Sequence, residues 1–305
     1  MIHPRLFHQV GERALEWLAA NADRFRPARD PLDPDVDVDT SLKPLGELAQ
    51  ISVVLDREGV AGGRQRALAR GLLDLVWEEL GRGGLLVALL DAEPGAPYPL
   101  ELYAPLWEAG LRHPPLEDLL RQTTGTRGWA AQEVLPTRAL GILNAERRTG
   151  LPPHGDRDQA VRRTWLGRLP EPWTAERTTC YMVTHTVFHL TNWGQDPAGL
   201  PDDIADYLTT WLPVWVDVWC ATEDWDLLGE LLAVDACLPR CALDEQVWTR
   251  YALAQRPDGL VPVRGRYPDA DADPDQVFAE CRHPTLVVAF AAALATSRAM
   301  TALVP

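Results

Sequence analysis

Two histidines spaced one helical turn apart are the residues of this sequence best placed to do chemistry. His185 and His189 lie in an otherwise apolar run, with Tyr181 one turn before them and Asn192 just after. Residues four apart share one helix face, so we expect both imidazoles to point into one space. A metal ion, a carboxylate or a polar substrate could pair with their ring nitrogens. The pair indicates either metal ligands or acid/base groups, or two hydrogen-bonded core histidines.

A second candidate group, Cys281 and His283, stands where polar residues meet a strongly apolar segment. Because Pro284 fits the first turn of a helix, we expect a helix over 283–299 with His283 at its N-cap and Cys281 just outside. The positive end of that helix would favour an anion and would lower the pKa of the nearby thiol. Cys281 and His283 could reach one metal ion, or the segment could be a polar helix start beside a buried cysteine.

Acidic residues at the start of another expected helix, over 225–238, form the third group. Asp224 fits the N-cap position, and Asp226 lies in the first turn, where negative charge is favourable. Capping explains most of this pattern. The alternative is that Asp224 or Asp226 is a catalytic or ligand carboxylate that orients an imidazole or takes a proton.

The absence of several familiar catalytic motifs argues against the chemistry that each of them performs. Thr186 stands where a His-Glu-x-x-His metalloprotease has its glutamate, so that class does not fit. The sequence has no phosphate-binding glycine loop, no dinucleotide fingerprint and no Gly-x-Ser-x-Gly elbow, which disfavours ATP, NAD and serine-hydrolase chemistry. A divalent metal, with zinc the most fitting ion, is the cofactor that the histidines and the cysteine suggest.

Composition sets limits on the partners. The chain has 305 residues, with 44 acidic and 29 basic side chains and a net charge of −15, which argues against nucleic acid and anionic membranes. Five cysteines, an odd number, and a first segment without the apolar core of a signal peptide favour the reducing cytoplasm. No uncharged apolar stretch reaches the roughly 18 residues of a membrane span, so we expect a soluble protein.

Helical periodicity dominates the chain, and sustained alternation typical of strands is nearly absent. We therefore expect an all-α protein, built as an α/α toroid or barrel of paired antiparallel helices. Residues 1–40 would form an N-terminal helix and an acidic linker, and residues 41–305 a single helical domain. The long break at 256–275 is typical of a functional lid.

Three segments, Thr184–Gly194, Asp224–Leu232 and Cys281–Leu286, together resemble an uncharacterised family of actinobacterial proteins often associated with natural-product gene clusters. The likeness covers about 120 C-terminal residues and implies a role in specialised metabolism. More distantly, the aspartate-rich helix start followed by a His-Pro-Thr helix is similar to protein prenyltransferase β-subunits. In that family, Asp, Cys and His from the inner helices of an α/α barrel bind zinc. Here Cys281 and His283 share one segment, and no Asp-x-Cys pair occupies the helix start.

We therefore expect an enzyme of specialised metabolism that performs non-redox chemistry on a small-molecule or peptide substrate, by cyclisation, group transfer, epimerisation or hydrolysis. The expected catalytic residues are His185, His189, Asp224, Asp226 and Tyr181, and the expected metal ligands are His185, His189, Cys281 and His283. The alternative is a non-catalytic helical scaffold that binds a peptide, a protein or a hydrophobic metabolite. Histidines gathered around one pocket would favour the enzyme.

Overall fold

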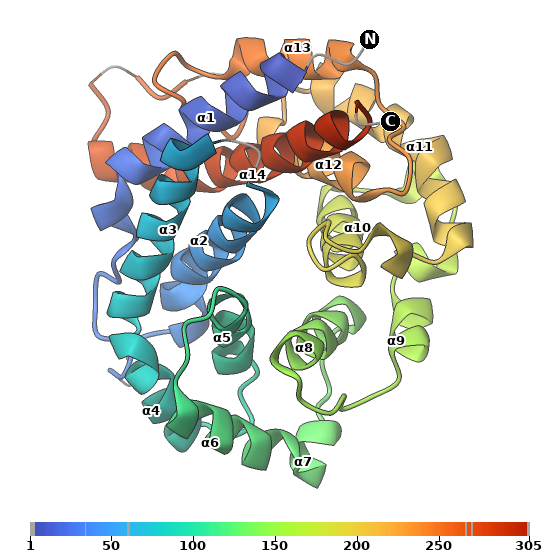
Figure 1. Ribbon diagram of the computed structural model, residues 1–305. Helices are drawn as coiled ribbons and strands as arrows, with labels where there is room; N and C mark the ends of the chain where they lie inside the picture. Colours follow the sequence, from blue (N-terminus) through green and yellow to red (C-terminus); the bar gives the residue numbers. More distant parts are fainter. Residues whose placement is uncertain (1–3, 34, 60–61, 266, 270, 304–305) are drawn as a thin grey trace. The chain divides into compact units, whose positions relative to one another are not determined.

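The computed structural model describes residues 4–33, 35–59, 62–265, 267–269 and 271–303 (Figure 1). Within these ranges the regular structure is helical, and the single β-bridge joins Asp224 to Arg264 outside any strand. The predicted all-α class is confirmed.

Two compact units divide the chain. One comprises Met1–Arg24, Val54–Ala69 and Trp165–Pro305, and the other Phe25–Val53 and Arg70–Thr164. The boundary at residue 40 that the sequence suggested stays a prediction. The first unit holds α1 (Pro4–Ala20), α10 (Arg177–Leu190), α11 (Asp202–Ala221), α12 (Trp225–Cys237), α13 (Glu245–Ala254) and α14 (Pro274–Thr301). The second holds α4 (Gly84–Ala92), α5 (Tyr98–Glu108), α6 (Pro114–Thr124), α7 (Arg127–Ala130), α8 (Pro136–Thr149) and α9 (Arg157–Arg163). Helices α2 (Val38–Glu58) and α3 (Gly62–Glu79) contribute residues to both units.

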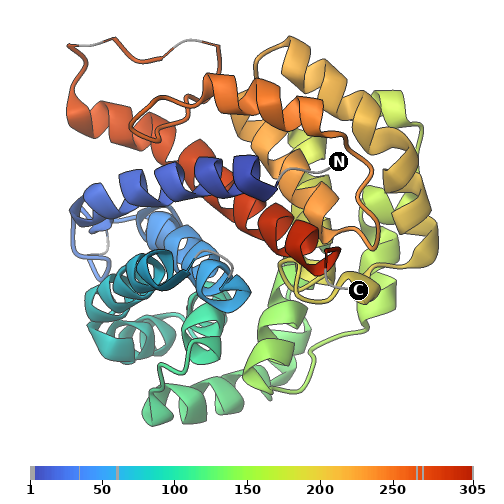
Figure 2. The ribbon, with the colours of Figure 1, turned by 45° about the horizontal axis from the view of Figure 1, so that its top comes forward.

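Helix α12 is the centre of the first unit, because all of its residues from Trp225 to Cys237 are buried. It packs against α14, α10, α11 and α13. Helix α14 also packs along α1, and Figures 1 and 2 show these two helices side by side and running in opposite directions. A helix buried on all sides depends on its neighbours for every polar group that it carries.

Helix α14 begins nine residues earlier than the sequence suggested, at Pro274 in place of residue 283. Its N-cap is Asp273, whose side chain accepts a hydrogen bond from the backbone N–H of Asp275, and Pro284 lies inside the helix. The prediction of a helix N-terminus at His283 was wrong. Proline inside a helix removes one backbone hydrogen bond. Burial of Pro284 and of the apolar residues after it, against α1 and α12, offsets that loss.

Helix α14 is also long and apolar enough to cross a membrane by length and composition alone. However, 67% of its most apolar stretch is buried inside the protein, as in the core helices of proteins that never enter a membrane. Length and apolar composition are therefore weak evidence for a membrane span here.

Helix α4 in the second unit has no periodic pattern in the sequence by which it could be predicted. Its sequence, from Gly84 to Ala92, is apolar on nearly every side, with Leu86, Leu89 and Leu90 buried. A segment without a polar face shows no helical period, so its pattern does not distinguish a helix from a buried strand.

The segment that follows α13 is packed onto the first unit, where the sequence had suggested a lid. The amide of Gln255 donates to the backbone carbonyls of Val10 and Gly259 at 3.0 and 3.1 Å. The backbone N–H of Val261 donates to the hydroxyl of Thr285 at 3.0 Å. Gly259 has φ +102°, and a Cβ there would lie 2.0 Å from a backbone oxygen of α1. We call residues 255–265 the strap.

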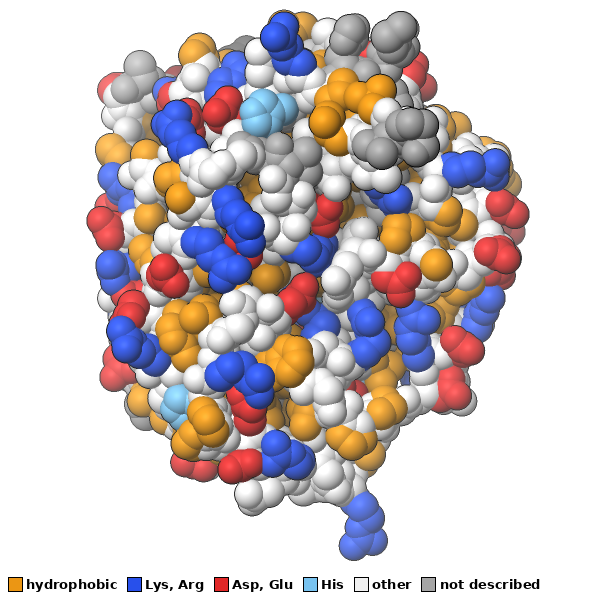
Figure 3. All heavy atoms as spheres, in the orientation of Figure 1, with side chains coloured by type: hydrophobic (Ala, Val, Ile, Leu, Met, Phe, Trp, Pro, Cys, Tyr) orange, Lys and Arg blue, Asp and Glu red, His pale blue; other side chains and the backbone are white. Residues whose placement is uncertain are grey.

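Charged side chains of both signs alternate on the face drawn in Figure 3. The net charge of −15 is therefore not gathered into one acidic patch on that face.

Because α12 is closely packed, we predict that adding a side chain at Gly229 destabilises the protein. A Cβ there would lie 2.8 Å from the hydroxyl of Tyr251 and 3.1 Å from Val287. Gly229→Ala should lower the free energy of unfolding by about 1–3 kcal/mol, because overpacking outweighs the helix propensity of alanine. Gly71→Ala is the matched control, since that helical glycine is exposed with open space around its Cβ position, and it should be neutral or stabilising. Urea denaturation measures both, and equal effects would contradict the prediction.

Candidate functional site

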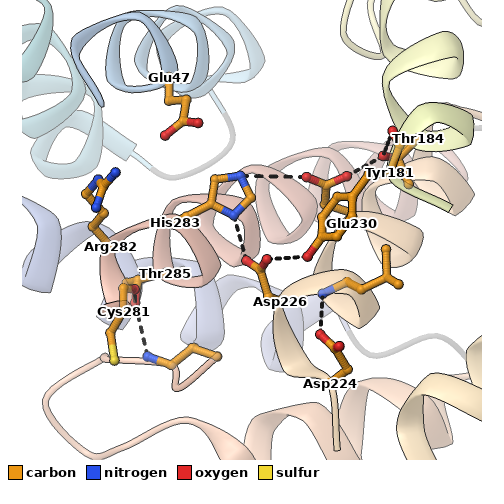
Figure 4. Close-up of polar contacts among 12 residues, drawn as sticks. Glu47, Tyr181, Thr184, Asp224, Asp226, Glu230, Cys281, Arg282, His283 and Thr285 are labelled. Carbon is orange, nitrogen blue, oxygen red and sulfur yellow. Dashed lines mark hydrogen bonds and ion pairs between the residues drawn. The ribbon is translucent and has the colours of Figure 1, made fainter. Parts of the chain in front are cut away.

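The carboxylate of Asp226 on α12 joins two of the residues that the sequence singled out (Figure 4). Its Oδ1 lies 2.6 Å from Nδ1 of His283, and its Oδ2 accepts a short hydrogen bond from the hydroxyl of Tyr181. One carboxylate therefore holds an imidazole from α14 and a phenol from α10. The contact with His283 is in the range of strong, charge-assisted hydrogen bonds.

A second buried carboxylate, Glu230, lies one turn further along α12. It accepts a short hydrogen bond from the hydroxyl of Thr184, and its Oε1 lies 3.7 Å from Nε2 of His283. The imidazole of His283 therefore stands between two carboxylates of one helix face (Figure 4).

Asp224, the N-cap of α12, is held by two arginines. Its Oδ2 accepts from Nε of Arg177 at 2.8 Å and from Nε of Arg264 at 2.9 Å, while its Oδ1 faces the backbone N–H of Leu227 at 3.4 Å. Arg177 also donates to the hydroxyl of Tyr181 at 2.9 Å, and its guanidinium lies 4.9 Å from the centre of that ring. The side chain of Asp224 thus both caps α12 and pairs with two arginines. We call Arg177, Tyr181, Thr184, Asp224, Asp226, Glu230, Arg264 and His283 the carboxylate cluster.

Backbone contacts place the strap beside the start of α12. The backbone N–H of Asp226 donates to the carbonyl of Val263 at 3.3 Å, and that of Gly265 donates to the carbonyl of Glu223 at 3.0 Å. Glu223 has φ +53°, a left-handed turn that precedes the helix. The backbone of Arg264 is therefore held by these hydrogen bonds, independently of the contact between its side chain and Asp224.

The electrostatics of the cluster follow from burial and pairing. Burial raises the pKa of Asp226, but the hydrogen bond and charge of His283, with Tyr181 and Arg177, bring it below the usual value. Burial, and then the charge of Asp226, raise the pKa of Tyr181 well above its usual value. Tyr181 is therefore a neutral donor, and Asp226 an anion, at neutral pH.

Solvent reaches the cations and the imidazole of the cluster but not its carboxylates. The side chains of Arg177, Arg264 and His283 are 38%, 58% and 29% exposed, while those of Asp224 and Glu230 are each 2% exposed. A partly exposed imidazole backed by a buried carboxylate is the arrangement of general acid/base sites.

His185 and His189 lie on the same face of α10 as Tyr181, and their ring centres are 6.3 Å apart. His185 packs edge-on against Phe188 at 6.1 Å, and His189 against Trp193 at 6.0 Å. Phe188 in turn contacts an aromatic ring of α14. The two imidazoles lie close together, and their ring contacts place them in an aromatic cluster formed by α10, Trp193 after its end, and Phe290 of α14.

Cys281 and His283 do not share a helix end, because both lie inside α14. Residues two apart on a helix point to nearly opposite sides. Burial raises the pKa of the Cys281 thiol to about 11, so the expected lowering by a helix N-terminus was wrong. Among the residues that the structure describes, no three His, Cys, Asp or Glu side chains are grouped to hold a metal ion.

Sequence reasoning missed half of the carboxylate cluster: Arg177, Thr184, Glu230 and Arg264. Two of these left a signal. Glu230 is four residues after Asp226 in an otherwise apolar helix, and Arg177 is four before Tyr181, so each shares a helix face with a predicted site residue. Arg264 left none, because the strap has no periodic pattern.

The depressed pKa of Asp226 predicts how its stabilising effect changes with pH. Asp226→Asn should destabilise the protein by about 2–3 kcal/mol at pH 7, because the neutral amide leaves the buried pair with His283 incomplete. A carboxylate whose pKa is lower in the folded than in the unfolded state stabilises the protein at pH values above its unfolded-state pKa. This stabilisation disappears as the pH falls through the folded-state pKa. The difference between wild type and variant should therefore shrink in urea denaturation from pH 7 to pH 3.

Asp118→Asn is the control for this prediction, since that carboxylate is 66% exposed and pairs with Arg121 within one helix. Its effect should be small at every pH. An Asp226→Asn difference that stays constant down to pH 3 would contradict the proposed pairing.

Comparison with known proteins places the chain in a family. A family model described as a domain of unknown function (DUF6895) matches residues 11–293, a range that includes the whole carboxylate cluster. No curated protein matches the chain, and neither does any solved structure. Because the matched range covers most of the sequence, the chain belongs to the uncharacterised DUF6895 family.

Proposed function

We propose that this protein is an enzyme that performs non-redox acid/base chemistry on a small-molecule or peptide substrate at His283. The observation that supports this best is the 2.6 Å contact between Asp226 and Nδ1 of His283, with Tyr181 on the other oxygen of the same carboxylate. Such a pair orients an imidazole and stabilises its protonated form.

His283 is the proton-transfer group in this proposal. With Asp226 ionised, Nδ1 carries the proton of the hydrogen bond, so proton exchange with substrate falls to Nε2, which lies 3.7 Å from Glu230, beyond hydrogen-bond distance. Asp226 stays an anion and balances the charge that His283 gains. Glu230, 3.7 Å from Nε2, lies close enough to favour the same imidazolium.

Tyr181 is the positioning residue in this proposal. Its hydroxyl donates to Asp226 and accepts from Arg177, which fixes the second carboxylate oxygen and keeps the first aimed at His283. The raised pKa of Tyr181 keeps the phenol neutral while this happens.

Proton transfer by a single imidazole is compatible with epimerisation, cyclisation, group transfer or hydrolysis, and we propose specialised metabolism as the setting. The α/α toroid arrangement, the cytoplasmic location and the absence of nucleic-acid and membrane partners stay predictions. Zinc binding by His185, His189, Cys281 and His283 also stays a prediction, and elemental analysis of the purified protein tests it.

Turnover tests the acid/base proposal. The purified protein is incubated with a mixed extract of small metabolites and short peptides, and mass spectrometry identifies the compounds that it consumes. His283→Ala should then lower kcat for such a compound by about 10²- to 10⁴-fold, the usual contribution of general acid/base catalysis. Tyr181→Phe, which keeps the ring beneath Arg177, should cause a smaller loss.

His8→Ala is the matched control, because His8 is a partly exposed histidine on α1 outside the carboxylate cluster, and its removal should leave turnover unchanged. Full activity in His283→Ala would refute the role of this imidazole. If no compound is consumed, the non-catalytic scaffold becomes the better explanation, and binding experiments replace turnover.

A further inference from the structure

Arg177 and Arg264 both contact Asp224, the residue that caps α12, although a cap needs neither of these cations. Two guanidiniums donate to a single buried carboxylate, Asp224, where one would suffice to pair with it. Arg177 approaches Asp226 only to 3.9 Å, and that carboxylate already pairs with His283. A helix cap alone needs no arginine.

Both guanidiniums use the same edge to hold Asp224. Nε and Nη2 of each point to the carboxylate or, for Arg177, also to Tyr181. Toward the residues that the structure describes, neither Nη1 makes a hydrogen bond. These outer edges belong to side chains that are 38% and 58% exposed, so a solute can reach them.

The two side chains are also fixed in advance. The Tyr181 ring lies 4.9 Å beneath the guanidinium of Arg177, and the bridge between Asp224 and Arg264 fixes the backbone that carries the second arginine. Guanidinium groups match the planar geometry of carboxylates and phosphates, and fixed ones lose little entropy when they bind.

We infer that Arg177 and Arg264 together bind a compact oxyanion, a carboxylate or a phosphate group of the substrate, beside His283. Tyr181 links the two places, because its hydroxyl contacts both Arg177 and Asp226, the carboxylate that holds His283. This inference rests on the proposed function for the word substrate, but the anion site itself is defined by the arginines.

Side-chain NMR of the full-length protein tests the site with two probes, inorganic phosphate and acetate, at constant ionic strength. The Nε–Hε signals of Arg177 and Arg264 should shift and saturate as the anion is added, while that of Arg256 stays in place. Tighter binding of phosphate or of acetate identifies which oxyanion the site prefers.

Arg264→Gln should weaken anion binding by about 10- to 100-fold, which is the effect of losing a charge-assisted hydrogen bond. Arg177 still pairs with Asp224 in this variant, so the fold should be kept, and thermal unfolding checks it. The matched control is Arg256→Gln, an arginine of the same strap that is 38% exposed and pairs with exposed Asp258. This control should bind the anion as wild type does.

His283→Ala separates this inference from the proposed function. Anion binding should persist in this variant even though turnover is lost, and a protein without any turnover should still bind the anion. The inference is overturned if neither probe shifts the two arginine signals at tens of millimolar. It is also overturned if Arg264→Gln binds as tightly as wild type, or if His283→Ala abolishes binding.

Discussion

The first unit depends on one constraint, that α12 is buried on every side while carrying three carboxylates and a fourth as its cap. Buried charges are tolerated only when they are paired or neutralised. Asp226 is paired, and its pKa falls below the usual value. Asp235 has mainly two backbone N–H donors, and burial raises its pKa to about 6. One helix thus contains a carboxylate whose partners lower its pKa and another whose pKa is raised by burial.

Satisfying these carboxylates brings together segments that are far apart in the chain. Helix α10 supplies Tyr181 and Thr184, α14 supplies His283, and the strap supplies Arg264. The strap is held by hydrogen bonds to α1 and α14, so its arginine is placed by backbone contacts. In this part of the molecule, the contacts that pair the buried carboxylates are therefore also the contacts that hold the segments together.

A paired ionic network is by itself weak evidence for function, because buried ion pairs also serve structure. The distribution of exposure is what sets this network apart. The carboxylates are buried, and the imidazole and guanidiniums that they hold are open to solvent. A structural network has no need to present its protonatable group outward, whereas a catalytic one must.

The sequence by itself determined the helical class, because helix periodicity is a local pattern. It also named Tyr181 and Asp226 by helix spacing, Asp224 as a cap, and His283 through an expected helix start that the structure places elsewhere. Only the tertiary structure decided that Asp226 holds His283, since those residues are 57 positions apart and nothing local links them. The start of α14 was misplaced because Pro284 is a local signal for a helix start, and burial against α1 and α12 overrides it. Arg264 lies in an irregular segment, so only the backbone pairing of the folded strap could place it at the site.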